Sequence, residues 1–385
     1  MGSIYSHAEF TIIAAAGKDA TYGLPGISRP RRQKGKEIIT GVALLEGFPH
    51  TFYTMQRSAW ASRGWTYQEC FLSPRRLVFT DNGVSYLCNS LHSMESEIIP
   101  LGWIQKSAGS LFQTFIPPGF YPDSMGEACR RLAEYSSRKL TNGDDALNAI
   151  LGILQTMENS VKGLRFIWGN PIEGDNLLLQ WHHKNPAKRR PQFPSWSYLG
   201  WEGYCDIACG IPRRHALPVP DIKVGDSQKP HYTFDNVPSL SIQMSDHGED
   251  ELRYLHATGP IIGVQLRSIR RQEGCEATLH PFCQGSSDEI YAVFDVSPDN
   301  HILARIHFDR RNISVNSIIG MPLDLQDSTG NYKRDAWILL LEKCGEIYER
   351  IGYVSWHDSY PMPSKDARPS QDIQLLKKIN AGGGL

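Results

Sequence analysis

The spacing of apolar and polar residues changes along this chain. Up to about residue 160, apolar residues fall in short runs or recur at helical spacing, as in residues 124–132 and 144–154. After Trp201, short alternating or apolar runs are separated by Gly, Pro, Asn, Asp and Ser, a texture typical of strands. The pattern predicts a mixed α+β chain with a β-rich C-terminal part.

Three elements are predicted near the start. Residues 8–16 (AEFTIIAAA) fit a strand or a short buried helix, because periodicity cannot decide so short a run. Residues 66–73 fit a helix, and the runs 77–80 and 84–88 fit a hairpin around Asp81-Asn82-Gly83. A helix and a hairpin close together indicate a folded unit that mixes both kinds of element.

Two further helices are predicted before the texture changes. Ser124 and Glu127 have the spacing of a capping box, in which the first side chain accepts a bond from the amide of the second residue. Asp144 precedes the apolar positions of residues 147–154 and is expected to cap that helix. A basic, Pro-rich connector over residues 184–194 follows, and these helices predict a helical middle layer.

Strands are predicted throughout the last part, as a sandwich or barrel. The clearest runs are residues 252–258, 261–266, 289–296, 301–307, 336–341 and 347–356.

Composition narrows the function classes. The 385 residues suggest two or three folded units, and the net charge of −1 gives no sign of a nucleic-acid surface. No apolar run approaches the roughly 20 residues of a membrane span. Eight cysteines are too few for a disulfide scaffold and suit a reducing, cytoplasmic location. Neither Cys205 with Cys209, nor Cys275 with His280 and Cys283, has the second half of a zinc site, so no metal is expected.

The familiar catalytic motifs are missing from the sequence. It contains no Walker A loop, no dinucleotide glycine fingerprint, no H-E-x-x-H and no G-x-S-x-G. The residues by themselves therefore name no reaction.

Several segments resemble one protein family. The first, R-G-W-T-Y-Q-E followed by L-S-P-R, resembles the signature that closes the fungal heterokaryon-incompatibility (HET) domain; its matching residues are Arg63, Trp65, Thr66, Gln68, Glu69 and Arg75. The second, F-P-S-W-S-Y-L-G-W, resembles a block downstream of many such domains; its matching residues are Pro194, Ser195, Trp196 and Trp201. Weaker likenesses lie at residues 4–15, 23–26 and 350–352.

The chain also departs from the family pattern. Members usually open with Y-x-x-L-S-Y-x-W-G and then W-I-D-x-x-C-I-x-Q, and neither segment is present here. The resemblance thus implies an incomplete, Toll-like α/β unit that lacks the front of its HET domain. We expect three parts: 1–95 as the C-terminal portion of a HET domain, 96–205 as a helical region ending in the second block, and 206–385 as a β-rich module.

The resemblance implies a function in fungal non-self recognition and programmed cell death. Such a protein signals through protein partners or self-assembly, without a cofactor and without being a metabolic enzyme. One alternative is a Toll-like enzyme that hydrolyses NAD, with NAD then as its cofactor. Another is a degenerate, truncated HET protein without toxic output, stranded in a gene cluster.

Two expectations concern individual residues. Glu69 is the one candidate catalytic carboxylate, by analogy with NAD-cleaving relatives, but the favoured interpretation makes it half of a capping box with Thr66. Trp196 and Trp201 are expected to be buried at the junction of the helical region and the β-rich module, because nearby Pro194, Gly200 and Gly203 let the backbone turn close to them.

Overall fold

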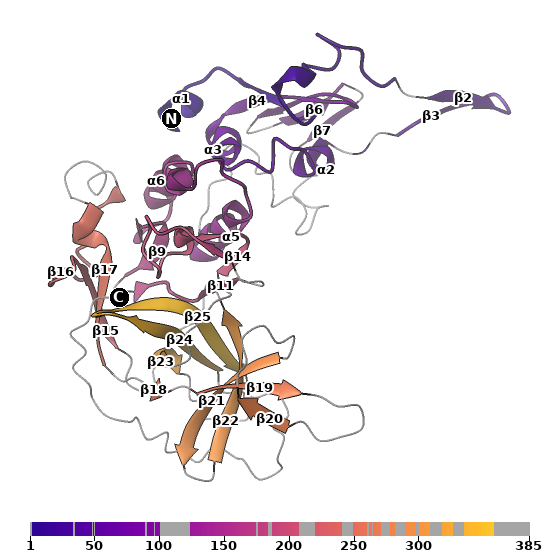
Figure 1. The fold of residues 1–385 in the computed structure, drawn as a ribbon. Helices are drawn as coiled ribbons and strands as arrows, with labels where there is room; N and C mark the ends of the chain where they lie inside the picture. The colour runs from indigo at the N-terminus through magenta and orange to yellow at the C-terminus, as the bar shows by residue number, and fades with distance from the viewer. Residues whose placement is uncertain are drawn as a thin grey trace. The chain divides into compact units, whose positions relative to one another are not determined.

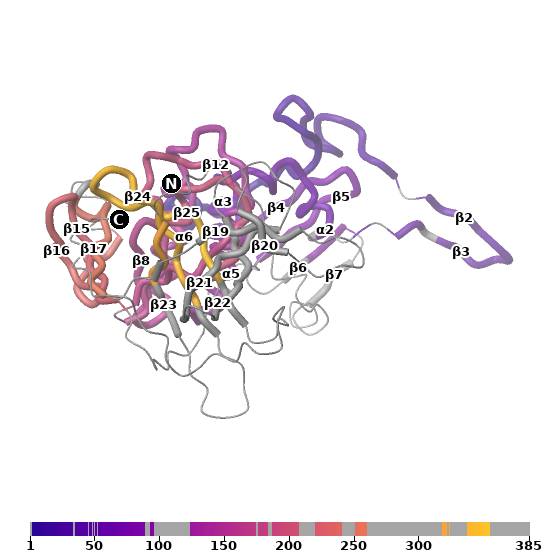
Figure 2. The backbone as a smooth tube through the Cα atoms, turned by 60° about the horizontal axis from the view of Figure 1, so that its bottom comes forward, coloured from indigo at the N-terminus to yellow at the C-terminus, as the bar shows by residue number. Residues whose placement is uncertain are grey.

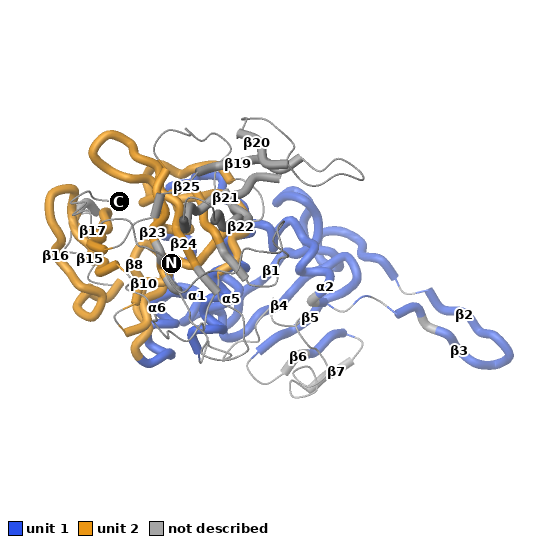
Figure 3. The backbone as a smooth tube through the Cα atoms, turned by 90° about the horizontal axis from the view of Figure 1, so that it is seen from below, with its two compact units in different colours: residues 1–162 blue, residues 163–385 orange. Residues whose placement is uncertain are grey.

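The structure is a computed structural model of the chain. It describes residues 2–33, 35–47, 49, 51–88, 91–95, 97–100, 124–174, 176–183, 187–207, 220–240, 249–259, 262–263, 265–270, 278–281, 289–297, 300–308, 318–325 and 335–357. The chain divides into two units, Met1–Lys162 and Gly163–Leu385, which Figure 3 shows in different colours. Each unit is described by itself.

A five-stranded sheet in the order β1-β4-β5-β6-β7 forms the centre of unit 1. β1 (Thr11–Ala14) settles the ambiguous run as a strand, and it pairs in parallel with β4 (Arg75–Thr80). A parallel pair needs a long crossover, and the chain between the two strands supplies it. The remaining pairs are antiparallel. β4 pairs with β5 (Gly83–Cys88), β5 with β6 (Leu91–Met94), and β6 with β7 (Glu97–Pro100).

The hairpin predicted around Asp81-Asn82-Gly83 is confirmed. β4 and β5 pair from Arg75 with Cys88 to Thr80 with Gly83, leaving two residues in the turn. Gly83 has φ of +156°, which a side chain disfavours, and the Thr80 hydroxyl donates to its carbonyl at 2.9 Å. The local turn chemistry was therefore sufficient to place this pair.

Unit 1 also contains helices, several of which are labelled in Figure 1. They are α1 (Gly2–Ser6), the short helix η1 (Ala20–Tyr22), α2 (Thr51–Gln56), α3 (Trp65–Leu72), α5 (Met125–Ser136), the short helix η3 (Gly143–Ala146) and α6 (Leu151–Ser160). Ile13 of β1, Val78 of β4 and Cys70 of α3 share a buried apolar cluster with Met55 and Leu87, so sheet and helices are joined by one core.

Of the caps predicted for the two middle helices, one is confirmed. Ser124 Oγ accepts from the Glu127 amide at 3.3 Å at the start of α5. The cap by Asp144 is wrong, because Asn142 accepts from the Asp144 amide at the start of η3, and α6 begins only at Leu151 without a side-chain cap. A tight helical turn thus takes the place of the expected first turn.

A hairpin of β2 (Lys36–Ile39) and β3 (Val42–Leu45) belongs to unit 1 but not to its sheet. Thr40 and Gly41 both have positive φ, the requirement of the tight turn that suits a twisted hairpin. Figure 2 shows this hairpin extending away from the rest of unit 1.

Unit 2 is built from strands. Its small sheets use β8 (Leu164–Ile167), β9 (Asn170–Glu173), β10 (Asn176–Leu177), β11 (Trp181–His183), β12 (Lys188–Arg189), β13 (Trp201–Glu202), β14 (Cys205–Ile207), β15 (Asp221–Gly225), β16 (Pro230–Tyr232) and β17 (Tyr254–Thr258), with the short helices η4 (Tyr198–Gly200) and η5 (Glu249–Leu252).

An eight-stranded antiparallel sheet, in the order β18-β23-β24-β25-β22-β21-β19-β20, follows in unit 2. Its strands are β18 (Ile262–Gly263), β19 (Gln265–Arg270), β20 (Thr278–Pro281), β21 (Glu289–Ser297), β22 (Asn300–Phe308), β23 (Ile318–Leu325), β24 (Asp335–Cys344) and β25 (Ile347–His357). All six runs predicted as strands contain strand residues: the run 252–258 contains β17 of a three-stranded sheet, and the other five lie in the eight-stranded sheet.

The mixed α+β class is confirmed. Within the expected helical region, however, the last α-helix described ends at Ser160, and the described part of residues 164–207 holds short strands and the short helix η4 instead. The division of the chain into parts ending near 95 and 205 stays a prediction, whereas the two units meet at Lys162. Among the described residues, no helix has the length and apolar character needed to cross a membrane.

Candidate functional site

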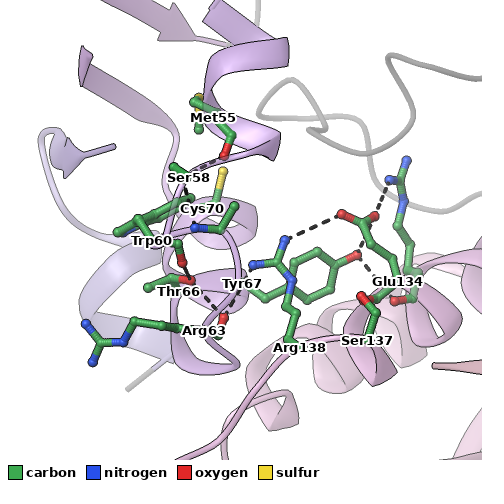
Figure 4. A network of polar contacts seen from close by, with 12 residues as sticks. Met55, Ser58, Trp60, Arg63, Thr66, Tyr67, Cys70, Glu134, Ser137 and Arg138 are labelled. Atoms are coloured by element: carbon green, nitrogen blue, oxygen red, sulfur yellow. Dashed lines mark hydrogen bonds and ion pairs between the residues drawn. The ribbon is translucent and has the colours of Figure 1, made fainter. Parts of the chain in front are cut away.

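The R-G-W-T-Y-Q-E segment lies on a turn and on the first half of α3. The helix begins at Trp65, after Gly64, and no side chain caps it. The Thr66 hydroxyl donates instead to the carbonyls of Trp60 at 2.6 Å and Arg63 at 2.8 Å (Figure 4). The predicted capping box of Thr66 and Glu69 is therefore wrong, because Thr66 already lies inside the helix.

Close packing explains the early start of the helix. The Gly64 amide donates to the Lys139 carbonyl at 2.7 Å, and the Lys139 amide donates to the Ser62 carbonyl at 2.7 Å. A Cβ on Gly64 would lie 2.5 Å from Leu140 Cδ2, so only glycine fits here without movement. The turn is thus held by a segment more than 70 residues away in sequence.

Two other signature side chains connect α3 to the chain around α6. Trp65 Nε1 donates to Asp145 Oδ2 at 3.2 Å, and Gln68 Oε1 accepts from the Gly152 amide at 3.0 Å. Gln68 is buried, and its carbonyl oxygen meets one of the helix's first amides, which have no partner within the helix. These residues therefore have internal structural roles.

Gly152 should not tolerate a larger residue. A Cβ there would lie 2.7 Å from Gln68 Oε1, 2.8 Å from Leu72 Cδ1 and 3.1 Å from Gly2 Cα. Overpacking of this kind costs about 1–3 kcal/mol, against a helix-propensity gain of up to about 1 kcal/mol. We expect Gly152→Ala to lower the unfolding free energy of unit 1 in denaturant titrations. Gly47→Ala, where a Cβ meets nothing within 4 Å, is the control, and equal stability of the two variants would contradict this packing.

Glu69 lies among aromatic residues and is partly buried. It accepts hydrogen bonds from Tyr5 of α1 and from Trp60. Burial raises the pKa of Glu69, although these bonds and the positive charge of Arg63 act in the opposite direction. The carboxylate therefore connects α1 to α3, the helix that carries the R-G-W-T-Y-Q-E signature and is called the signature helix below. Nothing in this geometry assigns it a reaction.

A buried charged network lies on the other side of α3 (Figure 4). The Tyr67 hydroxyl donates to Glu134 Oε2 at 3.1 Å, and the Arg138 guanidinium lies 4.3 Å from the Tyr67 ring centroid. Arg131 and Arg138 lie 3.4 and 3.5 Å from the Glu134 carboxylate, and Arg131 also pairs with Glu127. Burial raises the pKa of Glu134 to about 7 despite both arginines.

The two arginines of the L-S-P-R-R segment differ in environment. Arg75 is exposed and donates to the Glu9 carbonyl at 3.2 Å. Its neighbour Arg76 is buried and donates to the carbonyl and the Sγ of Cys70. The sequence resemblance named Arg75 but not Arg76. Because successive side chains of a strand point to opposite faces, the strand pattern indicates that Arg75 and Arg76 lie on opposite faces of β4.

The second block lies in unit 2 and is buried as predicted. Trp196 and Trp201 are 1% and 2% exposed. Trp196 Nε1 donates to the Arg253 carbonyl at 3.0 Å, and Trp201 Nε1 donates to the Ser195 carbonyl at 2.9 Å. Every indole N–H of the block thus has a partner, as burial of tryptophan requires.

Arg350 joins this block to β25. Its guanidinium lies 3.2 Å from the Trp181 ring centroid and donates to the carbonyls of Leu179 and Trp181. Its backbone amide donates to Ser195 Oγ at 3.2 Å. The weak likeness at residues 350–352 and the strong one at 193–203 therefore meet in one core.

Within the described part of the chain, no group of three or more His, Cys, Asp or Glu side chains could hold a metal ion. Cys209, Cys275 and Cys283 lie outside the described residues.

Comparison with known proteins supports the resemblance over the first segment. Residues 1–69 match the family model described as heterokaryon incompatibility protein (HET). No curated protein and no solved structure matches the chain. The match ends at Glu69, within the helix whose signature residues are described above, so residues 1–69 are similar to the heterokaryon incompatibility (HET) domain.

Proposed function

We propose that this chain acts in fungal non-self recognition, as a cytoplasmic protein whose contacts with other proteins trigger growth arrest or cell death. The exposed hairpin of β2 and β3 carries the proposal. Its side chains of Ile38, Ile39, Val42 and Leu44 are 51–69% exposed. Contiguous apolar surface of this kind marks protein interaction sites, and an isolated hairpin is only marginally stable in water.

The hairpin offers apolar side chains on both faces. Ile39 pairs with Val42, whereas Ile38 pairs with Ala43 on the opposite face. A partner that covers either face would remove apolar area from water, which is worth roughly 25 cal/mol per Å². This role requires no cofactor.

The signature helix supports an interaction protein over an enzyme. Trp65, Thr66 and Gln68 all bond to groups of their own unit. The specific observation that favours the alternative, NAD hydrolysis, is Glu69, because burial raises its pKa as in many catalytic carboxyl groups. The hydrogen bonds from Tyr5 and Trp60 fit a structural role equally well.

Expression in a fungal host separates the two functions. We expect wild-type protein to arrest growth with cellular NAD unchanged. The double variant Ile38→Asp, Leu44→Asp should abolish growth arrest, because it places a carboxylate on each apolar face that a partner would cover. Lys36→Gln, on the same hairpin, should leave growth arrest unchanged. Glu69→Gln keeps the size and a hydrogen-bonding oxygen and should still arrest growth. Circular dichroism and protein level confirm that each variant folds.

Two results would contradict the proposal. Loss of arrest and of NAD consumption together in Glu69→Gln, with an unchanged melting temperature, would establish the enzyme, since proton transfer by such a group contributes about 10²–10⁴ in rate. Normal growth with wild-type protein at confirmed levels would favour the degenerate protein without output.

A further inference from the structure

A cavity in unit 1 lies at one end of the parallel strand pair. Its volume is about 700 Å³, within the usual range for sites that bind small molecules. Gly17 and Lys18 line it just after β1, and Asp81 lines it just after β4. Tyr53 of α2 and Arg57, directly after α2, line another part. Glu69 is not among the lining residues.

The position of the cavity points to a ligand. Open α/β sheets bind ligands in the crevice outside the carboxyl ends of their parallel strands. β1 and β4 run in parallel, so residues that directly follow each strand share such an end. Gly17 has φ of +76°, and a Cβ there would lie 2.1 Å from the Tyr22 ring, so the chain needs glycine to leave β1 in this direction.

The charges of the cavity indicate an anionic ligand. Lys18 and Arg57 are both exposed and form no ion pair within the part of the chain that the structure describes. The opposing carboxylate, Asp81, already accepts from the Tyr22 hydroxyl at 2.6 Å. Lysine and arginine are the side chains that bind phosphate groups most effectively, the arginine through two parallel hydrogen bonds.

The remaining lining suits a ring. Tyr53 is 40% exposed, so part of its aromatic side chain is open to solvent beside the cavity. Bases stack on such rings without regard to their identity. Asp81 retains acceptor capacity for a sugar hydroxyl, because an ionised carboxylate has about four lone-pair sites.

We propose that this cavity binds a nucleoside diphosphate, with its phosphates at Lys18 and Arg57 and its base at Tyr53. Two cations match two phosphate groups, and the aromatic ring adds a contact that inorganic phosphate cannot make. The site is independent of the exposed hairpin of β2 and β3, so its test does not depend on growth arrest.

Calorimetric titration of the full chain with ADP, adenosine and inorganic phosphate tests the proposal. We expect ADP to bind, with adenosine and phosphate each at least tenfold weaker. Lys18→Gln and Arg57→Gln should each weaken ADP binding about 10- to 100-fold, the usual effect of losing a charged hydrogen bond. Lys139→Gln, an exposed cation of the same unit outside the cavity, should have no effect.

Conservative variants distinguish contact from damage to the fold. Tyr53→Phe should keep ADP affinity and Tyr53→Ala should lose it, with both melting temperatures close to that of the wild type. No heat with 1 mM ADP, affinity unchanged in both cation variants, or phosphate binding as tightly as ADP would each overturn the proposal.

Discussion

Trp196→Ala should lower the unfolding free energy of unit 2 by about 3–5 kcal/mol, the usual cost of truncating a buried tryptophan. Trp196 packs in an apolar cluster with Ile167, Val224 and Leu255. Its carbonyl accepts from Trp181 Nε1 at 3.1 Å, so movement of this backbone would disturb a second buried indole. Against a typical total of about 5–15 kcal/mol, the loss is large enough to unfold much of the unit.

Urea denaturation followed by circular dichroism measures this effect. Two units are expected to give separate transitions, and the one that shifts identifies unit 2. Trp196→Phe keeps an aromatic ring in the core and should lower the unfolding free energy by less than Trp196→Ala. Tyr204→Ala, an aromatic residue that is 43% exposed, should cost under about 1 kcal/mol. A loss of the same small size for Trp196→Ala would contradict the described core.

Unit 1 should become less stable as the pH rises from about 5 to 8. The pKa of Glu134 is raised to about 7 by burial, from an ordinary value of 4.5. Between these two values the folded chain keeps a proton that the unfolded chain releases, so rising pH favours unfolding. A difference of this size between the two pKa values lowers the unfolding free energy by about 3 kcal/mol, and the whole effect is reached above the pKa of Glu134 in the folded chain.

Glu134→Gln removes this titration and keeps an oxygen that can accept from the Tyr67 hydroxyl. We expect the variant to show a flatter dependence of stability on pH than the wild type, measured by denaturant titration at pH 5.5 and 8. Glu95→Gln alters an exposed carboxylate that pairs with Arg31, and it should keep the wild-type slope. Equal slopes for all three proteins would show that Glu134 is ionised throughout this range.

The sequence was informative where local chemistry decides the structure. The turn at Asp81-Asn82-Gly83 and the cap at Ser124 involve residues within a few positions of each other, and both were predicted. Six strand runs from residue 252 onward were predicted from their pattern, whereas the short strands within residues 164–207 were not, and neither was the order of strands in the sheet. β18 pairs with β23 and β22 with β25, and such long-range choices leave no mark in a single run of residues.

The failed cap at Thr66 shows the opposite case. Thr66 and Glu69 have the correct spacing, but Lys139 and Leu140 fix the backbone before the helix, and Tyr5 and Trp60 hold the carboxylate. Tertiary contacts therefore overrode a local motif. The cavity residues Lys18, Arg57 and Asp81 were missed for the same reason, since the parallel pairing of β1 and β4 brings Lys18 near Asp81, and the packing of α2 adds Arg57.

The contacts of Arg350 have a consequence for how the protein is made. Its partners Ser195 and Trp181 are 155 and 169 residues earlier in the chain. At about 5–20 residues per second, a ribosome needs roughly 8–30 s to reach Arg350 after Ser195. During that interval the F-P-S-W-S-Y-L-G-W block lacks the Arg350 guanidinium and its hydrogen bonds, so unit 2 completes this core only once Arg350 has been made. A premature stop before Arg350 would thus leave these aromatic residues exposed to chaperones and proteases.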